Sequence, residues 1–185
     1  MNKGFIPPHG GYRNLLSYQR AEIVYDATVY FCARFLDRWD RTVDQMVQAA
    51  RSGKQNIVEG SMASAVSKKT EIKLTNVARA SLEELLADYR DFLRVRKCEE
   101  WTMDHPYARR LSQLIRTRNA NYETFRKGIE HPDPAIAANV IIGLIKVTST
   151  LLNRQIQQLE KAFVKEGGLS ERMVQARLNE RKRRS

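Results

Sequence analysis

Basic side chains are the feature of this sequence with the clearest chemical use. The chain contains 32 Lys and Arg against 21 Asp and Glu, which gives a formal net charge of +11 at pH 7 and a sequence pI near 9.9. Cations neutralise phosphates, and affinity for a nucleic acid grows with the number of phosphates contacted. The surplus therefore favours an acidic partner, of which nucleic acid is the commonest.

Three segments gather these cations into candidate nucleic-acid contacts. The first is a predicted helix over 67–97, where helical spacing brings four cations close together around the circumference and two more mark its start. The others are the charged region 98–131 and the basic run at the C-terminal end. A solvated surface laced with ion pairs is the alternative interpretation of each segment. The candidate contacts are Lys69, Lys73, Arg79, Arg90, Arg94, Lys97, Arg116, Arg118, Arg181, Lys182, Arg183 and Arg184.

Catalytic motifs are absent from the sequence. It has no GxxxxGK[ST] phosphate loop, no GxGxxG, no HExxH and no GxSxG. The histidines His9, His105 and His131 lie beside prolines or in predicted connections, which is typical of surface residues. Cys32 and Cys98 are far apart and form no CxxC, so neither a disulfide framework nor a zinc site is expected. We predict a non-enzymatic protein with no metal and no cofactor.

Two glutamates are the strongest candidates for a metal site. Glu59 and Glu84 fall on helices predicted to be neighbours, but the Glu-x-x-His pairs of di-metal bundles are missing. The favoured interpretation is structural: buried or half-buried hydrogen bonds that fix the packing of two helices, with a nearby arginine balancing any buried carboxylate. The residues assigned to this packing role are Arg51, Asn56, Glu59, Gly60, Ser81 and Glu84.

The elements that must position these residues are helices. Apolar residues recur at helical spacing over about 12–38, from Asp40 or Thr42 through Val58, and over about 67–97. A fourth helix is predicted from a cap at Asp133 to Gly167. The expected fold is all-α: an antiparallel up-and-down four-helix bundle over 1–166, with a helical insertion at about 98–131 before the last helix and a basic C-terminal suffix at 167–185.

The apolar surface of the last bundle helix is wider than a single seam needs. Several aromatic residues also lie on the first helix. This extra surface could pack against the insertion, or it could form an interface between subunits, and the sequence does not decide between the two. No apolar run near 20 residues and no secretory signal is evident, so we expect a cytoplasmic protein with no membrane partner.

Two phrases of the sequence resemble a known family. Residues 51–60 read RSGKQNIVEG and residues 74–86 read LTNVARASLEELL. They are similar to the motifs of the 23S rRNA intervening-sequence proteins, although Val58 stands in place of alanine and Ala80 in place of glycine. The whole chain looks closest to the subgroup named for a four-helix bundle with a C-terminal suffix, here 163–177. The matching residues are Asn56, Ile57, Glu59, Gly60, Leu74, Ala78, Ser81, Leu82, Glu84 and Leu85.

The resemblance implies assembly and a partner. The family includes the accessory protein of diversity-generating retroelements, which forms a basic homopentameric barrel and binds nucleic acid and a reverse transcriptase. By this likeness we expect a homo-oligomer, and a pentamer if the chain assembles as that accessory protein does. We expect it to bind RNA or DNA through basic faces as an accessory factor. A reverse transcriptase or another protein is expected as a further partner. The alternative is a structural protein–protein scaffold without nucleic-acid binding, and an RNA-processing enzyme ranks third.

Overall fold

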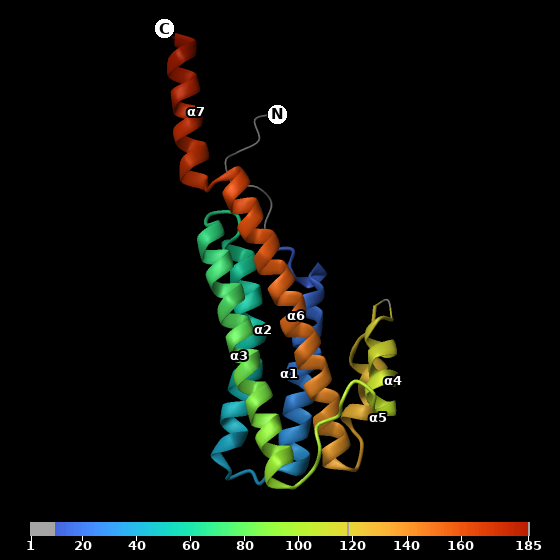
Figure 1. Cartoon of the computed structure of the whole chain (residues 1–185). Coiled ribbons are helices and arrows are strands. Elements are labelled where there is room, and N and C mark those ends of the chain that lie inside the picture. Colours follow the sequence, from blue (N-terminus) through green and yellow to red (C-terminus); the bar gives the residue numbers. More distant parts are fainter. Residues whose placement is uncertain (1–9, 118, 185) are drawn as a thin grey trace.

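The computed structural model of the chain describes residues 10–117 and 119–184, without the side chains of 166, 170, 172 and 184, and these residues are mostly helical (Figure 1). None of them lies in a β-strand, so the predicted all-α class is confirmed. The elements in chain order are η1 (Tyr12–Asn14), α1 (Leu16–Phe35), α2 (Arg41–Ala63), α3 (Lys68–Val95), α4 (Pro106–Ile115), α5 (Tyr122–Ile129), α6 (Pro134–Glu166) and α7 (Leu169–Arg184).

The ends of the long helices follow the local sequence. The side chains of Asp40, Ser67 and Asp133 accept hydrogen bonds from backbone N–H groups in the first turns of α2, α3 and α6. Pro134 occupies the start of α6, where its missing N–H costs nothing. Gly167, at φ +67°, ends the same helix in a conformation that favours glycine. Capping chemistry therefore sets where three of the long helices begin.

Four long helices surround a common core. α1 packs against α2 and α6, and α3 packs against the same two helices, as Figure 1 shows. Across the centre, the ring of Phe31 on α1 meets the rings of Tyr89 and Phe92 on α3 at centroid distances of 5.0 and 4.8 Å. The hydroxyl of Tyr89 donates to Thr28 Oγ1 at 3.2 Å, which satisfies its polar atom inside the core.

The chain between α3 and α6 folds over the outside of α6. It contains the short helices α4 and α5, both of which pack on α6, and α5 also contacts α1. Two glycines allow this close fit: a Cβ at Gly128 would lie 2.9 Å from Val140 Cγ2, and a Cβ at Gly143 would collide with Leu111 of α4. The second apolar side of α6 is thus covered within the same chain, at least over this stretch.

Two buried polar side chains attach this covering segment. Asn139 of α6 accepts from the backbone N–H of Trp101 at 2.7 Å and donates to the carbonyl of Glu99 at 3.0 Å. Arg20 of α1, 5% exposed, donates to the carbonyls of Ala120 and Ile115. Burial lowers the pKa of this guanidinium. Each side chain supplies partners that backbone groups in an irregular segment would otherwise lack.

The expectation that no segment is long and apolar enough for a membrane is wrong. By length and composition α6 passes that test over Pro134–Lys165, and 61% of its most apolar window is buried inside the protein. The core helix of a soluble protein passes the same test. Here α6 contacts α1, α3, α4 and α5, so it needs apolar side chains around most of its circumference.

The C-terminal suffix is a separate helix. α7 extends beyond the ends of the other helices in Figure 1 and packs against none of the other described elements. Met173, Val174 and Leu178 are exposed on it. α7 is therefore held by its connection to α6 rather than by a shared core.

Candidate nucleic-acid interface

The first half of α3 presents cations to solvent. Lys69 and Lys73 lie one turn apart and are exposed, and neither forms an ion pair with any described residue. Arg79 is half-buried and donates to the amide oxygen of Asn76 at 2.9 Å, so its charge is not neutralised by a carboxylate. These three predicted contacts retain the positive charge that phosphate binding requires.

In the second half of α3 both arginines pair with acidic residues, whereas among the described cations of the first half only Lys68 does so, with Glu71 at 3.0 Å. Glu100 lies between Arg90 of α3 and Lys146 of α6, at 2.9 and 2.5 Å. Arg94 forms an ion pair with Asp91 at 2.8 Å. The predicted contacts Arg90 and Arg94 thus belong to surface ion pairs, the alternative considered for this segment.

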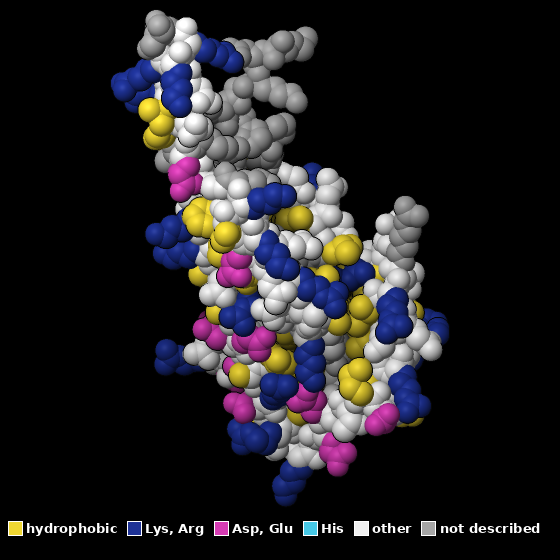
Figure 2. All heavy atoms as spheres, turned by 45° about the horizontal axis from the view of Figure 1, so that its top comes forward, with side chains coloured by type: hydrophobic (Ala, Val, Ile, Leu, Met, Phe, Trp, Pro, Cys, Tyr) yellow, Lys and Arg dark blue, Asp and Glu magenta, His cyan; other side chains and the backbone are white. Residues whose placement is uncertain are grey.

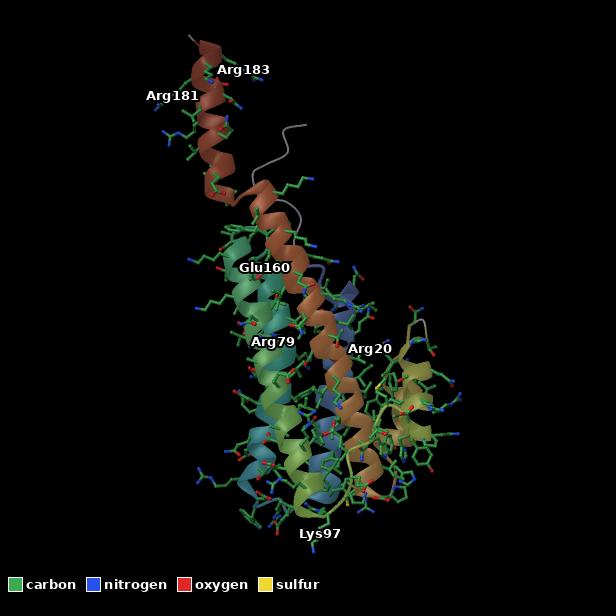
Figure 3. The ribbon with its side chains drawn as sticks, viewed as in Figure 1. Arg20, Arg79, Lys97, Glu160, Arg181 and Arg183 are labelled. Carbon is green, nitrogen blue, oxygen red and sulfur yellow. The ribbon has the colours of Figure 1, made fainter. Side chains whose placement is uncertain are left out.

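Lys97 follows the end of α3 rather than lying on it. Its φ is +56°, and its side chain is exposed at the end of the molecule opposite α7 (Figure 3). A non-glycine residue with positive φ marks a tight turn out of the helix. The predicted continuous row of cations therefore stops before its last member.

Acidic residues occupy the side of α3 that faces α2. Asp44 of α2 and Glu84 and Asp88 of α3 line a shallow groove with Ser52 and Ser81. Partial burial raises the pKa of Asp88, and the neighbouring Asp91 and Glu84 raise it further. This side of the molecule repels a polyanion.

The far half of α6 adds cations that sequence reasoning missed. Arg154, Lys161 and Lys165 are exposed and form no ion pair with the described residues. Their spacing of seven and four residues places them on one side of the helix. Figure 3 shows Arg79 on α3 and Glu160 on the neighbouring α6, both in the half of these helices nearer α7. The signal was present in the sequence, but the fourth helix was interpreted only for its apolar stripes.

The visible surface has an uneven distribution of charge. Figure 2 shows Lys and Arg side chains over the whole of this face, whereas most Asp and Glu side chains gather on its lower part. The candidate interface therefore draws on the exposed and half-buried cations of α3 and α6 in the halves of these helices nearer α7, which we call the α3/α6 basic face. The name covers Lys69, Lys73, Arg79, Arg154, Lys161 and Lys165.

The remaining predicted contacts lie apart from this face. Arg116 is exposed at the end of α4, and Arg118 lies outside the described residues. On α7, Arg181, Lys182 and Arg183 are exposed, and Figure 3 shows Arg181 and Arg183 near its free end. Nothing is described for the side chain of Arg184. The suffix cations could extend the face, but they are not packed against it.

The residues assigned to helix packing divide into two groups. The hydroxyls of Ser52 and Ser81 are 2.9 Å apart across α2 and α3, and Asn56 donates to Ser52 Oγ at 3.1 Å. A Cβ at Gly60 would lie 3.4 Å from the carbonyl oxygen of Glu71, so this glycine lets α2 and α3 approach closely. Ser81 and Gly60 thus take part in the expected packing of α2 on α3, whereas the hydrogen bond of Asn56 lies within α2.

The charged residues assigned to helix packing do not form such contacts. Glu59, Glu84 and Arg51 are all exposed, so the prediction that the two glutamates take part in buried hydrogen bonds is wrong. No group of three or more His, Cys, Asp or Glu suited to a metal ion occurs among the described residues.

Comparison of the chain with protein-family models, with curated proteins and with solved structures finds no match.

Proposed function

We propose that this protein is a non-enzymatic helical bundle that binds RNA or DNA through phosphate contacts on its α3/α6 basic face. In this proposal α1, α2, α3 and α6 form an antiparallel four-helix bundle, α4 and α5 are the insertion, and α7 is the suffix. Binding is directed to the backbone and is weakly selective for sequence.

The separation of paired and unpaired cations carries this proposal. Cations on the α3/α6 basic face have no carboxylate partner among the described residues, while Arg90, Arg94 and Lys146 do. A cation already paired with a carboxylate must lose that partner before it can release counterions from a phosphate, so it contributes less to binding. An unpaired group of six offers several phosphate contacts at once.

The likeness to the 23S rRNA intervening-sequence proteins extends the proposal to assembly. The motif residues Asn56 and Ser81 both hydrogen-bond to Ser52, and the Ser52–Ser81 bond joins α2 to α3, which is consistent with a structural motif. We include a homo-oligomer, with a pentamer as the family's form, and a reverse transcriptase or other protein as a further partner. Light scattering of the purified protein tests the subunit count.

A protein–protein scaffold is the second candidate. The exposed apolar residues Met173, Val174 and Leu178 favour it, because apolar side chains on a helix without a packing partner in its own chain are available to another protein. Such a scaffold would be indifferent to nucleic acid and to salt.

Two matched triple variants test nucleic-acid binding. The first is Lys73→Glu, Arg154→Glu, Lys161→Glu on the basic face, and the second is Arg90→Glu, Arg94→Glu, Lys97→Glu at the other end of α3. Both change the net charge equally. Binding of labelled single-stranded and duplex RNA is measured by anisotropy between about 50 and 200 mM salt.

The two variants should behave differently. The wild type should lose affinity steeply with salt, and the first variant should reduce the magnitude of the slope of log K against log salt by about 2 to 3. The second should change it by less than half as much. Equal losses in the two variants would refute the assigned face, and wild-type binding without salt dependence would refute the function. Circular dichroism verifies that each variant is folded.

A further inference from the structure

The segment that covers α6 forms, with the start of that helix, an open cavity of about 470 Å³. Its walls come from α4, α5, the start of α6 and the chain before α4, so it is independent of the α3/α6 basic face. The volume lies within the range of pockets that hold small organic molecules. Its lining residues are Trp101, Tyr107, Arg110, Leu111, Leu114, Glu123, Thr124, Phe125, Lys127, Gly128, His131, Ile136 and Val140.

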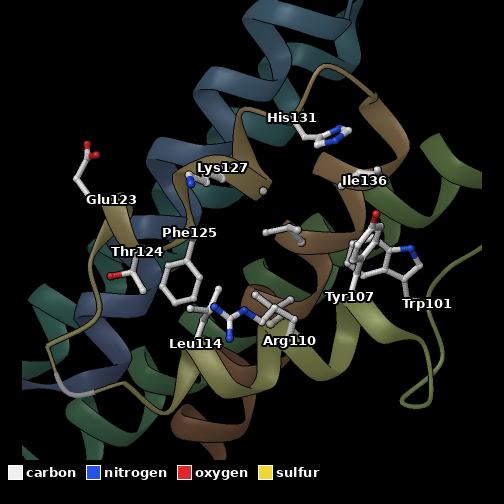
Figure 4. Close-up of a pocket in the computed structure, with 13 residues that line it drawn as sticks. Trp101, Tyr107, Arg110, Leu114, Glu123, Thr124, Phe125, Lys127, His131 and Ile136 are labelled. Atoms are coloured by element: carbon white, nitrogen blue, oxygen red, sulfur yellow. The ribbon is translucent and has the colours of Figure 1, made fainter.

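Aromatic rings form part of the lining of this cavity. Figure 4 shows Trp101 and Tyr107 together at one end and Phe125 at the other. The ring centroids of Trp101 and Tyr107 are 5.4 Å apart, and the ring of His105 lies parallel to that of Trp101 at 4.9 Å and 5.5 Å from that of Tyr107. Tyr107 is 55% exposed, which is unusual for a tyrosine beside an apolar hollow. Flat aromatic ligands stack well on such rings.

The charged groups at the cavity carry an excess of positive charge. Lys127 has no carboxylate partner among the described residues, and Arg110 donates only to the side-chain oxygen of Gln113, at 3.4 Å. Glu123 is already paired with Arg126 at 3.2 Å. Glu123, the one acid among the lining residues, is thus paired with an arginine that does not line the cavity. Arg110 on α4 and Lys127 on α5 remain available to an anionic ligand.

His131 adds a side-chain hydrogen-bonding group at the same site. Its Nδ1 accepts from the backbone N–H of Asp133 at 3.0 Å, which leaves Nε2 to carry the proton in the neutral ring. A hollow with aromatic and aliphatic walls and cations at its edge is complementary to a ligand with a flat apolar body and an anionic group.

We propose that this cavity binds a nucleobase whose phosphate contacts Arg110 and Lys127. The ligand has two sources: a free mononucleotide, or an unpaired nucleotide of a bound nucleic acid. The second source rests on the proposed function, whereas the first does not. Stacking on Trp101 and Tyr107 supplies affinity for the base, and the two cations supply affinity for the phosphate.

Tryptophan fluorescence gives a direct readout at this site. The chain has two tryptophans, and Trp39 is 78% exposed, far from the cavity in the sequence and outside its lining. The Trp39→Phe variant therefore leaves Trp101 as the single reporter. It is titrated with adenosine monophosphate, adenosine, ribose 5-phosphate and octanoate in turn.

The proposal predicts saturable quenching of Trp101 by adenosine monophosphate, and weaker binding of adenosine and of ribose 5-phosphate. Adding Arg110→Glu and Lys127→Glu should lower the affinity for adenosine monophosphate by at least about tenfold. The control pair Arg34→Glu and Arg41→Glu has the same charge change at exposed positions outside the cavity and should leave its affinity unchanged.

Three results would overturn the site: no saturable change with adenosine monophosphate, tighter binding of octanoate than of the nucleotide, or equal weakening by both charge-reversal pairs. Competition by oligoadenylate then identifies the source. Displacement of the mononucleotide assigns the cavity to a nucleotide of a nucleic acid, and its absence assigns the cavity to a free mononucleotide. Mononucleotide binding by a protein that fails the salt-dependent RNA assay would refute the proposed function and retain the site.

Discussion

The two halves of α3 show how differently the same residue types can be used within one helix. Residues 68–79 contain four Lys or Arg and one acidic residue, whereas residues 80–95 contain two Arg and four acidic residues. In the first half, Lys69 and Lys73 are exposed without acidic partners among the described residues. In the second, Arg90 and Arg94 form ion pairs. Periodicity locates a row of cations, but only the neighbours of each cation determine whether its charge is available.

The largest effect is expected on stability, from a change at Asn139. This side chain holds the backbone on both sides of Glu100, the residue that pairs with Arg90 in the second half of α3. Replacing it in Asn139→Leu leaves the N–H of Trp101 and the carbonyl of Glu99 without their partners. Leaving these two part-buried groups without partners costs about 2 to 4 kcal/mol. We expect that loss in urea-induced unfolding. Asn153→Leu, at an exposed position of the same helix, should change stability by no more than about 0.5 kcal/mol.

The next prediction releases the paired cations directly. Glu100→Gln removes the carboxylate between Arg90 and Lys146 and so frees two charges near the second half of α3. Affinity for RNA at low salt should rise several-fold, and the salt slope should become steeper by about 1 to 2. Anisotropy on the same labelled RNA measures both. Unchanged affinity would mean that ion pairing is not what separates the two halves of α3.

Much of the helical framework could be predicted from the sequence, because its determinants are local. Asp133 caps α6 as the sequence predicted, and the predicted start of the third helix at about 67 coincides with the cap Ser67. Gly167 marked a helix end for the same reason. The α2–α3 hydrogen bonds were only partly foreseen, since the outward direction of Glu59 depends on how closely the two helices approach.

The parts that could not be predicted depend on contacts between distant residues. Arg20 looks like a surface cation in its own helix, yet it is buried against carbonyls 95 and 100 positions away. Glu100 lies outside α3 and pairs with Lys146, 46 positions further along the chain. The cavity beside Trp101 combines three elements. No periodic pattern within one helix contains this information.

Acid should weaken the bridge made by Glu100. Partial burial by itself raises the pKa of this carboxyl, but hydrogen bonds and charge attraction from Arg90 and Lys146 outweigh it and lower the pKa below its usual 4.5. A lowered pKa in the folded state means that the stabilisation is present above the unfolded pKa and is lost as pH falls through the folded one.

Stability curves of the wild type and Glu100→Gln measure this loss. Because Arg90 and Glu100 are partly exposed, at 49% and 29%, the difference at neutral pH should be only about 0.5 to 1 kcal/mol. It should disappear as pH falls below the usual value of a glutamate. A difference that persists in acid would show that the amide removes packing rather than charge attraction.

The smallest effect is expected on the acidic side of α3, where like charges lie close together. Burial raises the pKa of Asp88, and Asp91 and Glu84 add to the shift, so ionising it in the folded protein is harder than in the unfolded chain. A raised carboxyl pKa destabilises the fold at pH values above it, which is the opposite sign to Glu100.

Asp88→Asn should therefore stabilise the protein at neutral pH by a few tenths of a kcal/mol once solvent screening is allowed for. The gain should shrink as pH falls, which thermal unfolding followed by circular dichroism measures. A loss of stability in Asp88→Asn would mean that the carboxylate has a favourable partner and that the acidic half of α3 is balanced rather than repulsive.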